Sequence, residues 1–96
     1  MRVRVEADLE SQVVTWSMAN GILTLKFTPI GQRGWPDRLF FGDHGRLALV
    51  ELKRPGEKPE PLQLIRIKEL NVRGIPATWS SDFHHCIDFL HRELLA

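Results

Sequence analysis

Residues 31–53 read GQRGWPDRLFFGDHGRLALVELK, and this stretch decides the fold. Its second half is an apolar run, residues 47–50, that passes directly into Glu51, Leu52 and Lys53. Because side chains alternate along a strand, Glu51 and Lys53 project from the same face. Burying either charge alone is costly, so a strand that keeps both needs a counter-ion, a metal ion or a substrate phosphate beside it.

Asp37 lies in the first half of the stretch and opens a second apolar segment, residues 39–41. The next four residues, GDHG at 42–45, are strong turn formers between two strand-like runs. They predict an antiparallel hairpin. With residues 41 and 46 flanking the turn, Asp37 is expected opposite residues 50–53.

This pairing predicts that Asp37 and Glu51 share a metal ion. A hard divalent cation such as Mg²⁺ takes oxygen ligands in near-octahedral geometry and keeps several waters. Two carboxylates and the carbonyl oxygen of Leu52 would provide such a site.

These residues resemble a known nuclease signature. Pro36-Asp37 followed by Glu51-Leu52-Lys53 is similar to the motif of the PD-(D/E)xK superfamily. The strings GQRGWPDRLFF and ALVELKRPGEKP, with Pro61-Leu62-Gln63 after them, resemble the VRR-NUC branch, which includes small stand-alone proteins of phages and bacteria. The resemblance covers residues 6 to about 80. It implies a restriction-endonuclease-like α/β core with a mixed central sheet, and hydrolysis of DNA phosphodiester bonds.

Composition predicts one globular domain over residues 1–96, because this length is too short for two cores. The chain is 43% hydrophobic and 26% charged, which is ordinary for a globular protein. It has neither an apolar run near the ~20 residues of a membrane span nor a secretory signal pattern, so we expect a cytoplasmic protein without membrane contact. The single Cys86 excludes an internal disulfide and a cysteine-based zinc site.

The net charge of +1 is small, but it is unevenly distributed. Residues 26–73 hold ten Lys or Arg against six Asp or Glu, whereas the segments on either side are slightly acidic. Because the basic excess coincides with the motif, we expect contacts with a phosphate backbone there, a solvated surface of mixed sign being the alternative. The candidate DNA-binding residues are Arg33, Arg38, Arg54 and Lys58.

A first helix is predicted over residues 6–20, with a stop at Gly21. Its apolar stripe has the i, i+4, i+7 spacing and consists of Leu9, Val13 and Trp16. Glu6 and Glu10 fall along one flank of this stripe. The resemblance implies that a first-helix Glu completes the metal site. Glu6 fits the VRR-NUC pattern, whereas Glu10 has the spacing to Gly21 of related junction resolvases and is slightly favoured; an acid that only complements the helix dipole is the alternative.

The predicted element order is α-β-β-β-α-β-α. A strand at 22–27 precedes the hairpin, and a proline-rich exposed loop at 54–61 leads to a second helix at 62–73. A last strand at 75–79 and a final helix complete the chain. The apolar face of that helix is wide enough to suggest burial against a second copy: Phe83, Cys86, Ile87, Phe89, Leu90 and Leu94. Its histidines lack a carboxylate or thiolate partner at a known metal spacing and are set aside as ligands.

Gln63 falls in the first turn of the second helix, close to the exit of the loop. Its amide could hold Lys53 or a substrate phosphate, and the resemblance favours this role over that of a neutral polar residue. Lys53 would orient the attacking water or stabilise developing negative charge. The adjacent carboxylates favour its charged form, so we prefer the electrostatic role. The predicted catalytic residues are Asp37, Glu51, Lys53 and Gln63, working with Mg²⁺ or Mn²⁺.

The resemblance further implies a structure-specific endonuclease acting on branched DNA. A two-fold homodimer would place two sites on a four-way junction, as in a Holliday-junction resolvase. A nicking or flap endonuclease with the same site, and a catalytically silent DNA-binding module, are the alternatives.

Overall fold

The computed structural model describes residues 8–96. The elements follow in the order α1 (Leu9–Ala19), β1 (Leu23–Lys26), β2 (Arg38–Phe41), η1 (Asp43–Gly45), β3 (Leu47–Leu52), α2 (Pro61–Val72), β4 (Ala77–Ser80) and α3 (Phe83–Leu94). The strands form one mixed sheet in the order β1-β2-β3-β4, with β3 and β4 parallel and the other neighbours antiparallel. The predicted α/β fold and the order α-β-β-β-α-β-α are confirmed.

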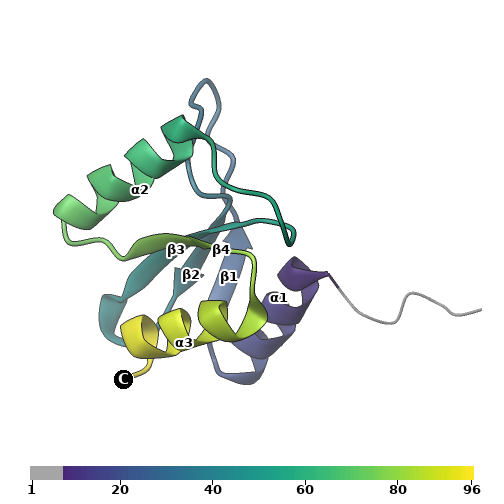
Figure 1. The fold of residues 1–96 in the computed structure, drawn as a ribbon. Helices are drawn as coiled ribbons and strands as arrows, with labels where there is room; N and C mark the ends of the chain where they lie inside the picture. The colour runs from purple at the N-terminus through teal and green to yellow at the C-terminus, as the bar shows by residue number, and fades with distance from the viewer. Residues whose placement is uncertain (1–7) are drawn as a thin grey trace, which may run out of the picture.

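Helices cover both faces of this sheet. Figure 1 shows α1 and α3 on one face and α2 on the other. Strand alternation divides the core accordingly. Phe40 and Val50 belong to the buried cluster formed with α1 and α3, whereas Leu39 and Leu49 pack in the cluster that includes Leu70 of α2. Each strand therefore presents successive side chains to different helices.

The first helix begins later than predicted. Asp8 has an extended backbone, and its Oδ1 accepts a hydrogen bond of 2.8 Å from the N–H of Ser11, so it caps a helix that starts at Leu9. Glu6 lies outside the described residues. The predicted apolar stripe is confirmed, because Leu9, Val13 and Trp16 all pack into the core.

The hairpin between β2 and β3 is confirmed with a register shift of one residue. Arg38 pairs with Val50 and Phe41 pairs with Leu47, so the turn is one residue longer than residues 41 and 46 would allow. The short helix η1 accounts for the extra residue, with His44 in the left-handed region at φ 59°. Continuing this register by one residue sets Asp37 opposite Glu51.

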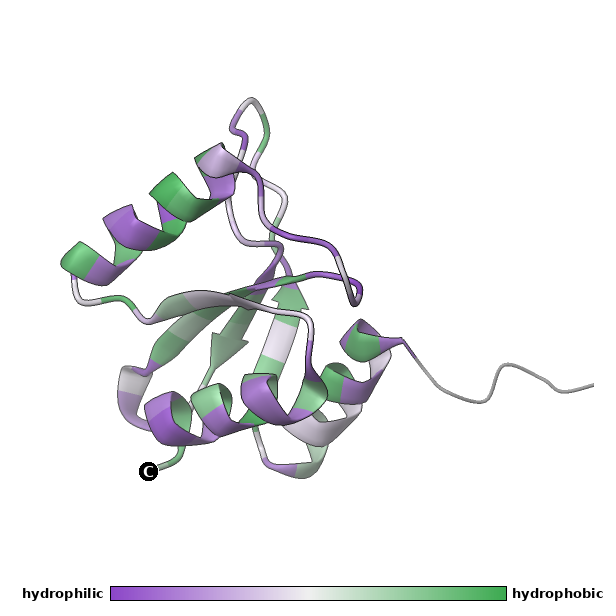
Figure 2. Cartoon of the chain, viewed as in Figure 1, coloured by the Kyte–Doolittle hydropathy of each residue, from purple (hydrophilic) through white to green (hydrophobic). Residues whose placement is uncertain are grey.

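The wide apolar face of α3 is used within the chain itself. Cys86, Phe89, Leu90 and Leu94 are buried in the cluster with Val13 and Phe40, and Figure 2 shows polar residues along the opposite side of α3. The expectation that this face needs a second copy is therefore wrong. A hydrophobic pattern indicates that a helix face is buried, but not whether the same chain or a second copy buries it.

Exposed apolar side chains lie instead on β1 and α2. The helix α2 contacts β4, and β1 at the far edge of the sheet keeps Leu23 and Leu25 exposed. On α2 the exposed residues include Leu64, Ile65 and Val72. Among residues 8–96, no helix is long and apolar enough to cross a membrane.

Gly42 generates a prediction for stability. A Cβ at this position would lie 2.6 Å from Cβ and 2.7 Å from the carbonyl oxygen of Leu94, in the last turn of α3. We expect Gly42→Ala to destabilise the fold by ~1–3 kcal/mol, as overpacking does, in urea denaturation. Gly45→Asn in the same turn is the control: nothing lies within 4 Å of that position, so it should show only the cost of a positive φ, which Asn tolerates better than most residues. Equal stability of Gly42→Ala and the parent would contradict this close approach.

Candidate active site

A pocket of about 730 Å³ opens between the first turn of α1, the loop after β3 and the start of α3. Figure 1 shows that loop reaching from β3 toward the beginning of α1. The charged lining is mainly acidic: Asp8, Glu10, Asp37, Glu57 and Asp82, against Lys53 and Arg54. A phosphate group would enter this pocket only with cations that offset the carboxylates.

The pairing of β2 with β3 brings the two central carboxylates together. The pairing of β2 with β3 includes Arg38 opposite Val50. Asp37 directly precedes Arg38, and Glu51 directly follows Val50. The Oδ1 atom of Asp37 also accepts a long hydrogen bond of 3.5 Å from the N–H of Leu52. The predicted juxtaposition of Asp37 with the end of β3 is therefore present.

Glu51 is only 6% exposed, and its two carboxylate oxygens differ in their surroundings. Oε2 lies 3.2 Å from Lys53 Nζ and accepts a hydrogen bond of 3.0 Å from Gln63 Nε2. Oε1 is buried and has no hydrogen-bond partner among the described residues. A buried acceptor left in this state costs ~1–3 kcal/mol, so Oε1 marks a place for a further ligand.

One prediction was that the Gln63 amide holds Lys53, but its Nε2 donates to Glu51 instead. The amide is fixed at both ends, because its Oε1 also accepts a hydrogen bond of 2.8 Å from the backbone N–H of Glu60. Gln63 therefore connects the start of α2 to Glu51.

The carboxyl group of Asp37 has a pKa raised from 3.8 to about 6. Burial is the largest cause, and the negative charge of Glu51 is the next. Glu10 raises the pKa further, whereas the N–H of Leu52 and the charge of Lys26 lower it. The charge of Glu51 thus opposes the ionisation of Asp37.

The oxygen of Glu51 that lacks a partner in the described part of the chain and the raised pKa of Asp37 both fit a divalent cation between the two carboxylates. The ion would supply a partner for Glu51 Oε1 and offset the repulsion at Asp37. Within residues 8–96, no three His, Cys, Asp or Glu side chains gather closely enough to form a metal site by themselves. Mg²⁺ commonly binds through one or two carboxylates and completes its shell with water or substrate phosphate, which Asp37, Glu51 and the Leu52 carbonyl would allow.

Arg38 projects from the face of β2 opposite to Asp37 and binds Glu10, which itself lines the pocket. Arg38 Nη1 lies 2.6 Å from Glu10 Oε2, and Lys26 Nζ lies 3.4 Å from the same oxygen. Arg38 is 8% exposed, so it does not reach the surface where the sequence placed a DNA contact. The prediction that Arg38 binds DNA is not supported by this position.

The other three candidate DNA-binding residues, Arg33, Arg54 and Lys58, are exposed. Arg54 and Lys58 lie on the loop between β3 and α2, which is largely hydrophilic in Figure 2. Arg66, which the sequence did not single out, lies with its guanidinium 5.1 Å from the ring centre of Trp35 and donates to the carbonyl of Arg33. It anchors the loop that carries Arg33.

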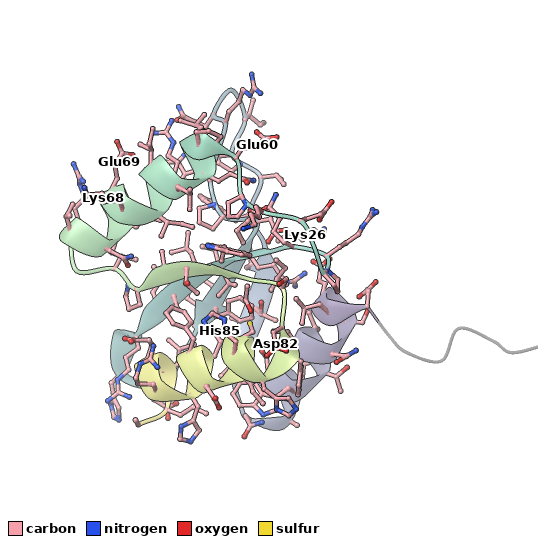
Figure 3. The ribbon with its side chains drawn as sticks, viewed as in Figure 1. Lys26, Glu60, Lys68, Glu69, Asp82 and His85 are labelled. Carbon is pink, nitrogen blue, oxygen red and sulfur yellow. The ribbon has the colours of Figure 1, made fainter. Side chains whose placement is uncertain are left out.

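The wall of the pocket at α3 was also missed. Ser81, Asp82 and Phe83 line it, and Asp82 caps the helix by accepting a hydrogen bond of 2.8 Å from the N–H of His85. Figure 3 shows Asp82 and His85 at this end of α3. The sequence predicted a final helix, but nothing in its pattern indicated that the start of this helix lines the same pocket as Lys53.

The chain is similar to a protein named as a putative nuclease and to solved structures of VRR_NUC domains. No family model matches the sequence. A phage protein named "Putative nuclease p44", from Acyrthosiphon pisum secondary endosymbiont phage 1, is 42% identical over 64 residues, which are 67% of this chain and 69% of that protein. A solved structure described as a VRR_NUC domain has a TM-score of 0.77 and 27% identity, and covers 88% of this chain and 90% of its own. Another, described as a VRR_NUC domain protein, has a TM-score of 0.69 and 18% identity over 97% of this chain and 90% of its own, and so shows the fold alone.

The raised pKa of Asp37 predicts a gain in stability on removing its charge. Between pH 3.8 and about 6 the folded protein keeps a proton that the unfolded chain has released, so stability falls as pH rises through this window. The full shift would correspond to ~3 kcal/mol, and solvent screening of this partly exposed group reduces that. We expect Asp37→Asn without metal to be more stable than the parent by ~1 kcal/mol at neutral pH, and by less near pH 4.

Urea denaturation in a chelator at both pH values measures this difference. Asp88→Asn, on the exposed side of α3, controls for the loss of one carboxylate. A lower stability of Asp37→Asn at neutral pH would show that the Asp37 charge is compensated within the protein.

Proposed function

The chain belongs to the VRR-NUC family of nucleases, and we propose that it is a metal-dependent endonuclease that hydrolyses phosphodiester bonds in branched DNA. The observation that carries the proposal is Glu51, a buried carboxylate with one oxygen held by two donors and the other without a partner within residues 8–96. Such an arrangement presents a single oxygen for coordination. Asp37 stands across the hairpin from it.

Asp37, Glu51 and the Leu52 carbonyl would hold the ion. A bound Mg²⁺ or Mn²⁺ lowers the pKa of a coordinated water and offsets charge on the phosphate. A first-helix carboxylate would complete the set in the family pattern. Of the two candidates, Glu6 lies outside the described residues and Glu10 already binds Arg38 and Lys26.

Lys53 would stabilise the negative charge that develops on the phosphate. Its side chain is 16% exposed, lines the pocket and is held by Glu51 Oε2. A charge fixed in advance in a partly dry site stabilises a transition state without reorganising. Gln63 would serve the same end by holding Glu51, because its bond to Oε2 leaves Oε1 to the ion.

We propose a four-way junction as the substrate and a homodimer as the active form. Arg33, Arg54 and Lys58 provide exposed positive charge for the phosphate backbone. Strand β1 supports a dimer contact, because it is an edge of the sheet formed by residues 8–96 and keeps Leu23 and Leu25 exposed. A nicking or flap endonuclease would use the same site on another DNA structure.

Cleavage should depend on Glu51, Lys53 and a metal. We expect Glu51→Gln and Lys53→Met to lose at least ~100-fold in cleavage rate with Mg²⁺ or Mn²⁺, since each removes charge at the reacting phosphate. The measurement is single-turnover cleavage of labelled DNA, with circular dichroism to verify folding. Glu69→Gln and Lys68→Met, on exposed positions of α2 labelled in Figure 3, make the same changes away from the pocket and should cleave normally. Full activity of either site variant would move the active site elsewhere.

Labelled four-way, flap and linear duplex DNA distinguish the possible substrates. We expect paired cuts in the four-way junction and a dimeric mass by light scattering. Leu25→Lys on β1 should give monomers, whereas Val72→Lys on α2 should not, because a buried charge opposes association only inside the contact. Preference for flap or linear DNA would favour the alternative enzyme, and no cleavage of any substrate with either metal would leave a silent DNA-binding module.

A further inference from the structure

Arg38 is a charged residue held inside the packing between sheet and helix. Its Nη1 lies 2.6 Å from Glu10 Oε2, and its Nε donates a hydrogen bond of 3.2 Å to Thr24 Oγ1. Thr24 in turn donates to the carbonyl oxygen of Leu39 at 2.7 Å. One guanidinium therefore joins α1, β1 and β2 at the end of the sheet where Asp37 stands.

Glu10 is the counter-ion that makes this burial possible. Arg38 is 8% exposed, whereas Lys26, the other cation at Glu10, keeps 64% of its side chain exposed. Solvent screens the contact with Lys26 much more than the contact with Arg38. Removing one partner of a buried pair leaves an uncompensated charge, whereas replacing both partners by apolar residues is often tolerated.

The link to the site is the backbone of β2. Asp37 directly precedes Arg38, and strand alternation sends the two side chains to opposite faces. The carbonyl of Asp37 also accepts a hydrogen bond of 2.8 Å from the N–H of Phe27, which extends the β1–β2 pairing past Arg38. Holding Arg38 therefore holds the peptide from which the Asp37 carboxylate projects toward Glu51.

We infer that Arg38 is a positioning residue for the metal site, an inference that rests on the proposed function. Its bonds to Glu10 and Thr24 keep Asp37 opposite Glu51. Glu10 serves this clamp as a counter-ion and does not coordinate the ion. The clamp, defined as Glu10, Thr24 and Arg38, holds the Arg38 side chain on the face of β2 opposite to the Asp37 side chain, while its Glu10 lines the same pocket as Asp37.

A double-mutant cycle tests the clamp with Mn²⁺ alone as the probe. The proteins are the parent, Glu10→Met, Arg38→Met and the double variant, with thermal unfolding measured in a chelator and Mn²⁺ affinity by calorimetry. We expect each single variant to lower Tm by roughly 10 °C and to weaken Mn²⁺ binding ~10–100-fold, as loss of a residue behind a ligand does. The double variant should recover the Tm and an Mn²⁺ affinity within about threefold of the parent.

Two further variants keep the test decisive. Leu94→Ala, buried at the far end of the same core, should lower Tm without weakening Mn²⁺ binding, which separates positioning from general destabilisation. Arg38→Lys keeps the charge but loses the bond to Thr24, so its Mn²⁺ affinity should fall between the parent and Arg38→Met. It replaces Arg38→Met if that variant does not fold.

The outcomes separate the clamp from the proposed function. A stable double variant that binds Mn²⁺ as weakly as Glu10→Met would make Glu10 a ligand and overturn the inference. Unchanged Mn²⁺ affinity in a destabilised Arg38→Met would show that Arg38 is a purely structural residue, and this too would overturn the inference. Absence of Mn²⁺ binding in the parent would instead remove the proposed function, and the inference with it.

Discussion

The buried carboxylate of Glu51 is the constraint on which the rest of the structure depends. A charge with 6% exposure at the end of β3 requires partners, and each comes from a different element. Lys53 directly follows that strand and Gln63 reaches from α2, whereas Asp37, just before β2, brings a second carboxyl group whose pKa Glu51 raises. The hairpin and the crossover through α2 are therefore also the means by which one acid is surrounded.

Adjacent charged residues of the chain project in opposite directions at β2. Asp37 shares the face of Glu51, whereas Arg38 projects from the opposite face and binds Glu10 of α1. Glu10 also lines the same pocket as Asp37 and raises the pKa of its carboxyl group. The ion pair and the two carboxylates therefore meet at the end of the sheet.

Much of the fold and part of the site could be predicted from the sequence. Strong turn residues and a charged end on an apolar strand identified the hairpin and the facing Asp37 and Glu51. The role of Arg38 could not be read in this way, because a basic residue beside a motif has the same pattern whether it meets DNA or an acid from a distant helix. Alternation along the strand sends the Arg38 side chain to the face opposite that of Asp37. The sequence did not show that Glu10 of α1 meets Arg38 there. The prediction that the apolar face of α3 packs against a second copy failed for a related reason. Residue spacing shows that a face is apolar, but not which element packs against it.

The two hydrogen bonds of Gln63 couple the end of the proline-rich loop to Glu51. One end of the Gln63 amide holds the backbone at Glu60, where the proline-rich loop ends, and the other end holds Glu51. A displacement of the loop's end at Glu60 would be transmitted through the Gln63 amide to Glu51 Oε2. The position of the loop's end and the orientation of the buried Glu51 carboxylate are therefore coupled through one side chain.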